Sequence, residues 1–61
     1  MANGRSDIVD VPGELRRETD KAFLIFDGTQ EVWLPKALVE YDPTEGTFAM
    51  PEWIAHDKGL I

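Results

Sequence analysis

The densest apolar run of the chain is KAFLIF (21–26), and it is followed by DGTQ (27–30) and then by EVWLP (31–35). The residues on both sides of the DG pair are mostly aliphatic and aromatic, as in the strands of a β-hairpin. The glycine supplies the left-handed backbone conformation that a tight hairpin turn needs. The pattern therefore predicts a hairpin over residues 21–35.

Alternation along these two strands separates two faces, and both are apolar. The face predicted to form the core carries Ala22, Leu24, Phe26, Val32 and Leu34. The opposite face is predicted to carry Phe23, Ile25 and Trp33 beside Glu31. We expect this second face to be an apolar interface, covered either by another part of the chain or by a partner.

The segment before the hairpin, DIVDVPGELRRETD (7–20), begins with β-branched residues and is interrupted by Pro12-Gly13. We predict a first strand that is bent near this pair and runs to about Thr19. A helix over GELRRETDKAF (13–23) is the alternative, because its first residues after the glycine tolerate helix. Residues 1–7 are small and polar, and they are predicted to be a flexible N-terminal tail.

The segment after the hairpin starts with KALVEY (36–41), in which helical spacing and a strand pattern compete. We favour a short helical turn that leads into a strand. DPTEG (42–46) has the composition of a turn, and TFAM (47–50) is predicted to be the last strand. Together these elements predict a single domain over residues 8–61.

A short helix over about 51–58 is predicted to end the domain. Pro51 suits the first helical position, and Gly59 suits the residue that terminates a helix. The helix is too short to be stable alone, so it must pack on the sheet through Trp53, Ile54 and Leu60. The predicted fold class is mainly β (a β-rich α+β fold), with three to four antiparallel strands in a small meander or barrel-like sheet and one short C-terminal helix.

The charge of the chain limits its possible partners. Its 61 residues include twelve acidic and six basic ones, for a formal net charge of −6. Because proteins that bind nucleic acid neutralise phosphates with basic residues, direct binding of DNA or RNA is disfavoured. The chain has no cysteine and no apolar run long enough to span a bilayer, so we expect a cytoplasmic protein without a membrane association.

Acidic residues in the predicted turns and strands are the candidate contacts to a protein partner. This predicted partner-binding set comprises Glu14, Glu18, Asp20, Asp27, Glu31, Glu40, Asp42 and Glu45. For any single one of them, a solvated surface charge is the favoured interpretation. As a group, they match the carboxylates with which a protein could occupy a basic groove that normally holds nucleic acid.

Residues for catalysis or cofactor binding do not form a pattern in the sequence. The chain has one serine, Ser6, in the predicted tail, and one histidine, His56, near the end of the predicted helix. A serine triad needs these groups held rigidly together, and a zinc site needs three or four converging ligands. The glycines are scattered and do not form a phosphate-binding loop. We therefore expect a non-enzymatic protein without metal or cofactor.

The pattern ETDKAFLI…DG…EVWLPKALV…PEWIAHDKGLI resembles a diffuse set of small proteins encoded by bacteria, phages and other mobile elements. The match covers Glu18 to Ile61, and it departs from the pattern at Ala37-Leu38, where a polar pair is usual. The resemblance implies a small β-rich fold and a phage or mobile-element context. It implies no particular activity.

Three functions remain open from the sequence. The first is an inhibitor that resembles anti-CRISPR proteins in size and charge and fills the basic groove of a bacterial nucleic-acid-handling complex. The second is a self-associating structural module, such as a homodimer through the apolar interface. The third is a single-stranded nucleic-acid accessory protein on a small OB- or SH3-like barrel, with Phe23 and Trp33 as a base-stacking platform. We favour the first.

Overall fold

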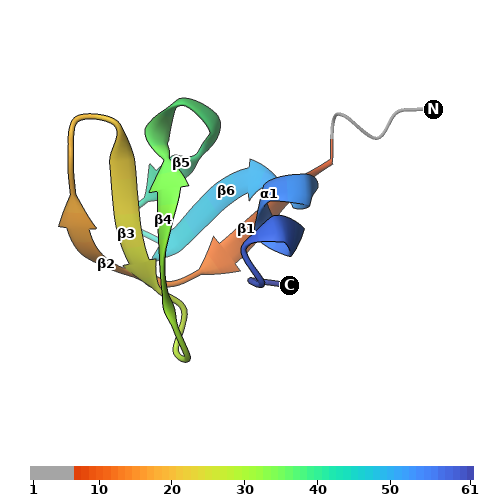
Figure 1. The fold of residues 1–61 in the computed structure, drawn as a ribbon, viewed down its shortest axis with the longest axis horizontal. Coiled ribbons are helices and arrows are strands. Elements are labelled where there is room, and N and C mark those ends of the chain that lie inside the picture. The colour runs from red at the N-terminus through yellow and green to blue at the C-terminus, as the bar shows by residue number, and fades with distance from the viewer. Residues whose placement is uncertain (1–6) are drawn as a thin grey trace.

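The computed structural model describes residues 7–61, which form six strands, a 3₁₀ turn and one short α-helix. The strands make two antiparallel three-stranded sheets (Figure 1). The mainly β class with one C-terminal helix is therefore confirmed, although the strands number six instead of three to four. No closed barrel forms within residues 7–61. Apart from Asp7, the predicted tail lies outside the described residues.

The first sheet, which we call the meander, contains β2 (Glu14–Glu18), β3 (Ala22–Phe26) and β4 (Glu31–Pro35) in this spatial order. The predicted hairpin is its β3–β4 half, and Gly28 in the connecting turn has the expected left-handed conformation, with φ of 103°. The alternative helix over residues 13–23 does not form. A bulge between Leu15 and Arg17 shifts the register of β2 against β3.

The second sheet joins both ends of the domain, and we call it the terminal sheet. In it, β6 (Thr47–Pro51) lies between β1 (Ile8–Pro12) and β5 (Glu40–Asp42). The favoured interpretation of KALVEY is confirmed, because the 3₁₀ turn η2 (Lys36–Leu38) leads into β5. The predicted turn over 42–46 connects β5 to β6.

Gly13 divides the predicted bent strand into β1 and β2, which belong to different sheets. Its N–H donates a hydrogen bond of 3.1 Å to the carbonyl oxygen of Gly46 in the turn between β5 and β6. A Cβ at this position would lie 3.3 Å from the carbonyl oxygen of Phe26 and 3.4 Å from the side chain of Ile25. The bend thus brings the start of the meander close to the β5–β6 turn, and a larger residue at position 13 would be tightly packed against β3.

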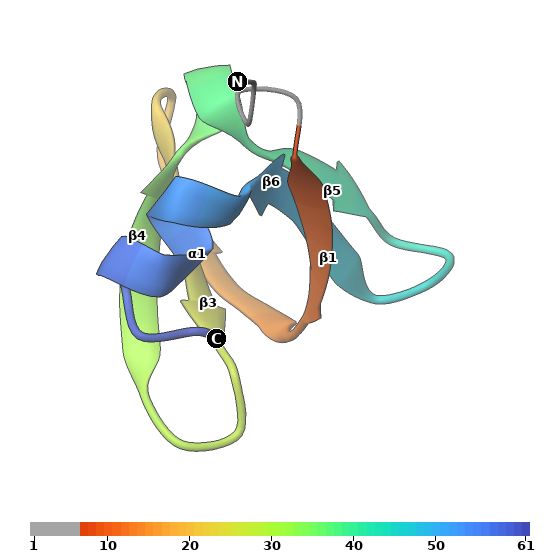
Figure 2. The same cartoon turned by 90° about the vertical axis from the view of Figure 1, so that its right-hand side faces the viewer.

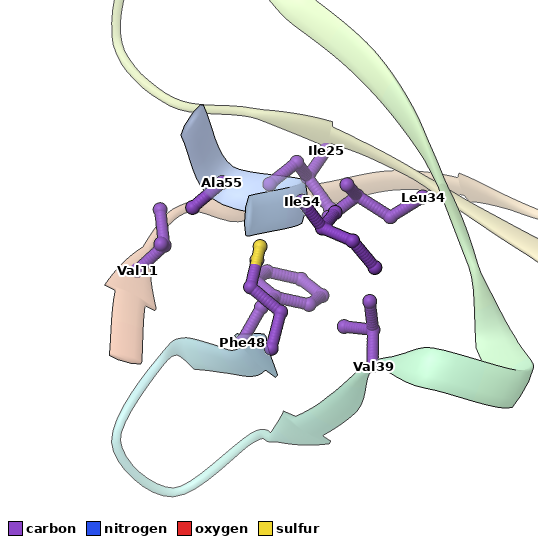
Figure 3. Close-up of a cluster of buried hydrophobic side chains, with 8 residues drawn as sticks. Val11, Ile25, Leu34, Val39, Phe48, Ile54 and Ala55 are labelled. Carbon is purple, nitrogen blue, oxygen red and sulfur yellow. The ribbon is translucent and has the colours of Figure 1, made fainter. Parts of the chain in front are cut away.

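The core lies between the two sheets and under the helix α1 (Glu52–Asp57) (Figure 3). Its buried side chains come from both sheets, the helix and the η2–β5 connection: Val11, Ile25, Leu34, Val39, Phe48, Met50, Ile54 and Ala55. Phe48 is at the centre, stacked on Tyr41 at 4.6 Å and edge-on to Phe23 at 5.8 Å between ring centroids. The two sheets therefore share one small core.

The predicted assignment of residues to the two faces of the hairpin is wrong. Ile25 pairs with Val32, and Phe23 pairs with Leu34, so these four residues face the core together. Leu24 pairs with Trp33 on the outer face. The reason is the length of the loop, because Phe26 pairs with Glu31 and four residues lie between them. An even number of loop residues places odd-numbered positions of β3 on the same face as even-numbered positions of β4.

The helix α1 lies across the opening between β4 and β1 (Figure 2). Pro51 precedes the helix as its N-cap instead of starting it. The helix ends in a Schellman motif, in which the N–H of Leu60 donates to the carbonyl of Ala55 and the N–H of Gly59 donates to that of His56. Gly59 has the left-handed conformation, with φ of 74°, that this motif requires.

Candidate functional site

An acidic hollow of about 430 Å³ lies on the outer face of the terminal sheet. Asp10 and Glu40 are on the two strands that flank β6, and both are opposite Ala49 in the register. Because Ala49 is small, the two carboxylates stand at the sides of a shallow depression. Asp42 and Glu45 line the same hollow from the β5–β6 hairpin.

The β5–β6 turn positions the last two of these carboxylates. One oxygen of Asp42 accepts hydrogen bonds from the backbone N–H groups of Thr44, at 3.0 Å, and Glu45, at 3.2 Å. The N–H of Gly46 closes the turn by donating to the carbonyl of Asp42 at 2.8 Å. Asp42 therefore organises the loop, and Glu45 is left exposed at its tip.

The residues that line the acidic hollow include four carboxylates and no basic side chain among those described. On the meander, by contrast, acidic residues lie beside basic ones. Glu14 pairs with Arg16 at 3.0 Å, and Glu18 pairs with Lys36 at 2.6 Å. The negative charge of the described residues is thus partly compensated on the meander, whereas the acidic hollow has no basic side chain in its lining.

The structure divides the predicted partner-binding set. Three members, Glu40, Asp42 and Glu45, lie together at the acidic hollow. The other members are on the meander or its turns: Glu14, Glu18, Asp20, Asp27 and Glu31. Asp10 joins the first group and was not in the predicted set. Alternation in IVDVP already places Asp10 opposite Val9 and Val11, but the sequence does not show that β1 lies beside β6.

Asp27 has a local structural role in the β3–β4 turn. Its carboxylate accepts hydrogen bonds of 2.8 Å from the backbone N–H groups of Thr29 and Gln30. These bonds, that of Gln30 above all, hold the pKa of Asp27 below its ordinary value of 3.8. This carboxylate therefore stabilises the turn of the hairpin.

The predicted apolar interface is not assembled as one face. Ile25 is fully buried, and Phe23 is half-buried against Tyr41 and Phe48. Trp33 is 46% exposed on the outer face of the meander, on the other side of the sheet from the first two. A stacking platform of Phe23 with Trp33 is therefore absent from the described part of the chain.

A second surface of interest surrounds Trp53, which was predicted to be buried under the helix but is 64% exposed. The helix turns Ile54 and Ala55 into the core instead, and Trp53 projects from its side. Together with Pro35 and Leu38 it lines a depression of about 180 Å³, with Ile54 at its base. We call this depression the anchor groove.

Within residues 7–61, no three side chains of the metal-ligating types converge as a candidate metal site. None of the helices in this part of the chain is long and apolar enough to cross a membrane. The sequence matches no known family of proteins, no curated protein and no solved structure.

Proposed function

We propose that this protein is a small, non-enzymatic binding protein that docks its acidic hollow on a basic surface of a protein partner. One observation carries the proposal. The outer face of the terminal sheet gathers Asp10, Glu40, Asp42 and Glu45 without a basic side chain among the residues of the hollow. The acidic residues of the meander support the proposal less, because arginine and lysine partly neutralise them.

The physical basis is electrostatic complementarity. Clustered carboxylates produce a negative potential that attracts a basic surface, speeds encounter and disfavours acidic partners. Such a surface competes directly with nucleic acid, because phosphates are attracted by the same lysine and arginine residues. The net charge of −6 strengthens this attraction at a distance, within a Debye length of about 8 Å at physiological salt.

The partner class that fits best is a bacterial nucleic-acid-handling complex, and specifically a CRISPR-type defence complex. Size, charge and the resemblance to small proteins of phages and mobile elements support this choice. On this proposal the protein acts in the host bacterial cytoplasm as an anti-CRISPR-like inhibitor that occupies the groove for nucleic acid.

The test is competition between this protein and target DNA for purified CRISPR-type effector complexes. DNA binding is measured by electrophoretic mobility over a range of salt concentrations. We expect the protein to displace DNA, and we expect the double reversal Glu40→Lys/Glu45→Lys to weaken its binding at least tenfold and to lower the salt dependence. Asp42 is left intact in this variant because it organises the turn.

A matched control reverses two exposed carboxylates of the meander, Asp20 and Glu31, to lysine. It changes the net charge equally, so inhibition that persists in this variant assigns the effect to the acidic hollow. Inhibition that survives the Glu40→Lys/Glu45→Lys reversal would sink the electrostatic proposal. Retention of a labelled single-stranded oligonucleotide by the protein itself at low salt would instead indicate a nucleic-acid accessory protein.

A further inference from the structure

The anchor groove exposes apolar surface that the fold itself leaves uncovered. Leu38 is 47% exposed and Trp53 is 64% exposed, and the groove between them also contains Pro35. The two residues belong to different elements, η2 and α1. The η2 turn follows β4 directly, and α1 is held by buried Ile54 and Ala55. The groove is therefore a largely apolar depression where η2 and α1 approach each other.

The anchor groove is continuous with the acidic hollow. Leu38 also lines a neighbouring hollow with Ile8, Glu40 and Ala49. Glu40 and Ala49 in turn line the acidic hollow. In Figure 2 the η2 turn lies at the top, where the chain passes from β4 to β5. One partner can therefore contact the carboxylates and the groove at the same time.

The charges around the groove indicate the chemistry of its occupant. Asp7, Glu52 and Asp57 line the hollow on one side of Trp53, together with His56. The groove itself is lined by Lys58 together with Asp57, and Lys36 in the neighbouring hollow is already paired with Glu18 at 2.6 Å. A second copy of this chain would bring the same carboxylates against their own counterparts. A basic partner would neutralise them.

The size of the groove indicates how it is filled. Its volume of about 180 Å³ is below the roughly 300–1,000 Å³ of pockets that hold small molecules. A single apolar side chain on the surface of a protein fits this size class. Exposed tryptophan at a depression is also typical of the residues that dominate binding energy in protein interfaces.

We propose that the anchor groove receives an apolar side chain of the same basic partner that binds the acidic hollow. This inference rests on the proposed function and deepens it, because it assigns two different tasks to two adjoining surfaces. The acidic hollow accelerates association, and the anchor groove slows dissociation. The partner surface must then present an apolar residue, such as leucine, next to lysine and arginine.

The test uses three synthetic helical peptides, each labelled with a fluorophore, and measures their binding to the intact chain by anisotropy and stopped flow. The first peptide has leucine and arginine beside each other on one face of the helix. The second has serine in place of leucine, and the third has glutamine in place of arginine. We expect the first to bind at least tenfold more tightly than the second, with the difference in the dissociation rate.

The two tryptophans provide a matched pair of variants. Trp53→Ala should remove the preference for the leucine peptide, whereas Trp33→Ala, an equal change on the outer face of the meander, should preserve it. Leu38→Ser tests the groove independently of Trp53, and circular dichroism checks that each variant folds. A leucine preference that persists in both Trp53→Ala and Leu38→Ser would overturn the inference.

The failure of this inference is distinct from the failure of the proposed function. If Glu40→Lys/Glu45→Lys weakens the arginine peptides while groove variants change nothing, the acidic hollow stands and the anchor groove does not. If the reversal also changes nothing, the proposed function fails. A dimer in analytical ultracentrifugation that Trp53→Ala dissociates would overturn the inference in favour of a second copy of the chain.

Discussion

Asp27 shows how a single residue determines a turn. Its carboxylate accepts two backbone N–H groups of the β3–β4 loop, so the loop is organised by one side chain. The charged form accepts these bonds best, which is why the pKa of this carboxyl is lowered from 3.8. The stability that this turn contributes therefore depends on pH.

This pH dependence has a definite sign. Because the pKa is lower in the folded state, the stabilisation is complete above the ordinary value of 3.8 and is lost as pH falls through the folded pKa. The variant Asp27→Asn keeps an oxygen acceptor but does not titrate. In urea denaturation, we expect it to lose less stability over this pH range than the wild type loses. Identical pH profiles for the two proteins would contradict the assigned role.

Residue-scale prediction from the sequence succeeded for the turn and failed for the faces. Asp27-Gly28 identified the hairpin, because local backbone chemistry determines a turn. The faces depend on whether the loop has an even or an odd number of residues, and the strand ends at Phe26 and Glu31 decide this. The four residues DGTQ between the two predicted strands already give an even number, but the prediction grouped even-numbered positions of both strands on one face. Consequently Trp33 was assigned to the wrong side of the sheet.

At the scale of elements, Gln30 connects the hairpin loop to the end of the helix. Its side-chain amide donates to the carbonyl oxygens of Lys58, at 3.1 Å, and Gly59, at 3.2 Å. These carbonyls belong to the C-cap residue and the residue after it, so the bonds join the hairpin loop to the segment that follows the helix. Leu60 directly follows these two residues in the chain and packs against the core.

We expect Gln30→Ala to loosen the C-terminal segment selectively. Loss of hydrogen bonds at an exposed site should lower global stability by about 0.5–1.5 kcal/mol. The amide of Leu60, which donates to the carbonyl of Ala55, should exchange with solvent faster than in the wild type, while amides of β3 should change by no more than the global loss. Thr29→Ala in the same loop serves as a control. An unchanged exchange rate of the Leu60 amide would show that the hydrogen bonds of Gln30 do not stabilise the C-terminal segment.

The elements were mostly predictable, and the exceptions have physical causes. Pro12-Gly13 indicated a bend, but the sequence does not show that the strand passes from one sheet to the other there. This transfer raises the number of strands. The exposure of Trp53 was also missed, because a helix of six residues has one narrow face for the core, which Ile54 and Ala55 fill. On so short a helix, apolar character alone does not show which of the adjacent residues Trp53 and Ile54 is buried.

At the scale of the whole molecule, stability depends on one small core around Phe48. A domain of 61 residues has a total stability of about 3–9 kcal/mol at usual values per residue. Phe48 is completely buried and contacts the rings of Phe23 and Tyr41. Replacing such a residue by alanine costs about 3–5 kcal/mol.

We therefore expect Phe48→Ala to unfold most or all of the protein at 25 °C, as measured by far-ultraviolet circular dichroism and urea denaturation. Trp53→Ala removes an even larger aromatic group, but its side chain is 64% exposed, so it should cost less than about 1 kcal/mol. Comparable losses for the two variants would show that the core is not centred on Phe48.

The candidate site was less predictable from the sequence than the fold, because part of it depends on contacts between residues that are distant in the chain. Glu40, Asp42 and Glu45 are close in the chain, and their grouping follows from one hairpin. Asp10 reaches them only because the first and last strands pair, which is a long-range contact. The compensation of Glu18 by Lys36 likewise joins residues that are distant in the sequence. The sequence alone therefore does not show which carboxylates are paired with a basic residue and which are free to contact a partner.

The passage of the chain at Gly13 from one sheet into the other has a consequence for the order of folding. Strands of the meander are neighbours in sequence, so its contacts close short loops. The terminal sheet pairs Ile8 with Pro51, and this contact costs the entropy of closing nearly the whole chain. We expect the meander to form early and the pairing of β1 with β6 to come last. The acidic hollow, which needs Asp10 beside Glu40, is then completed only by the final step of folding.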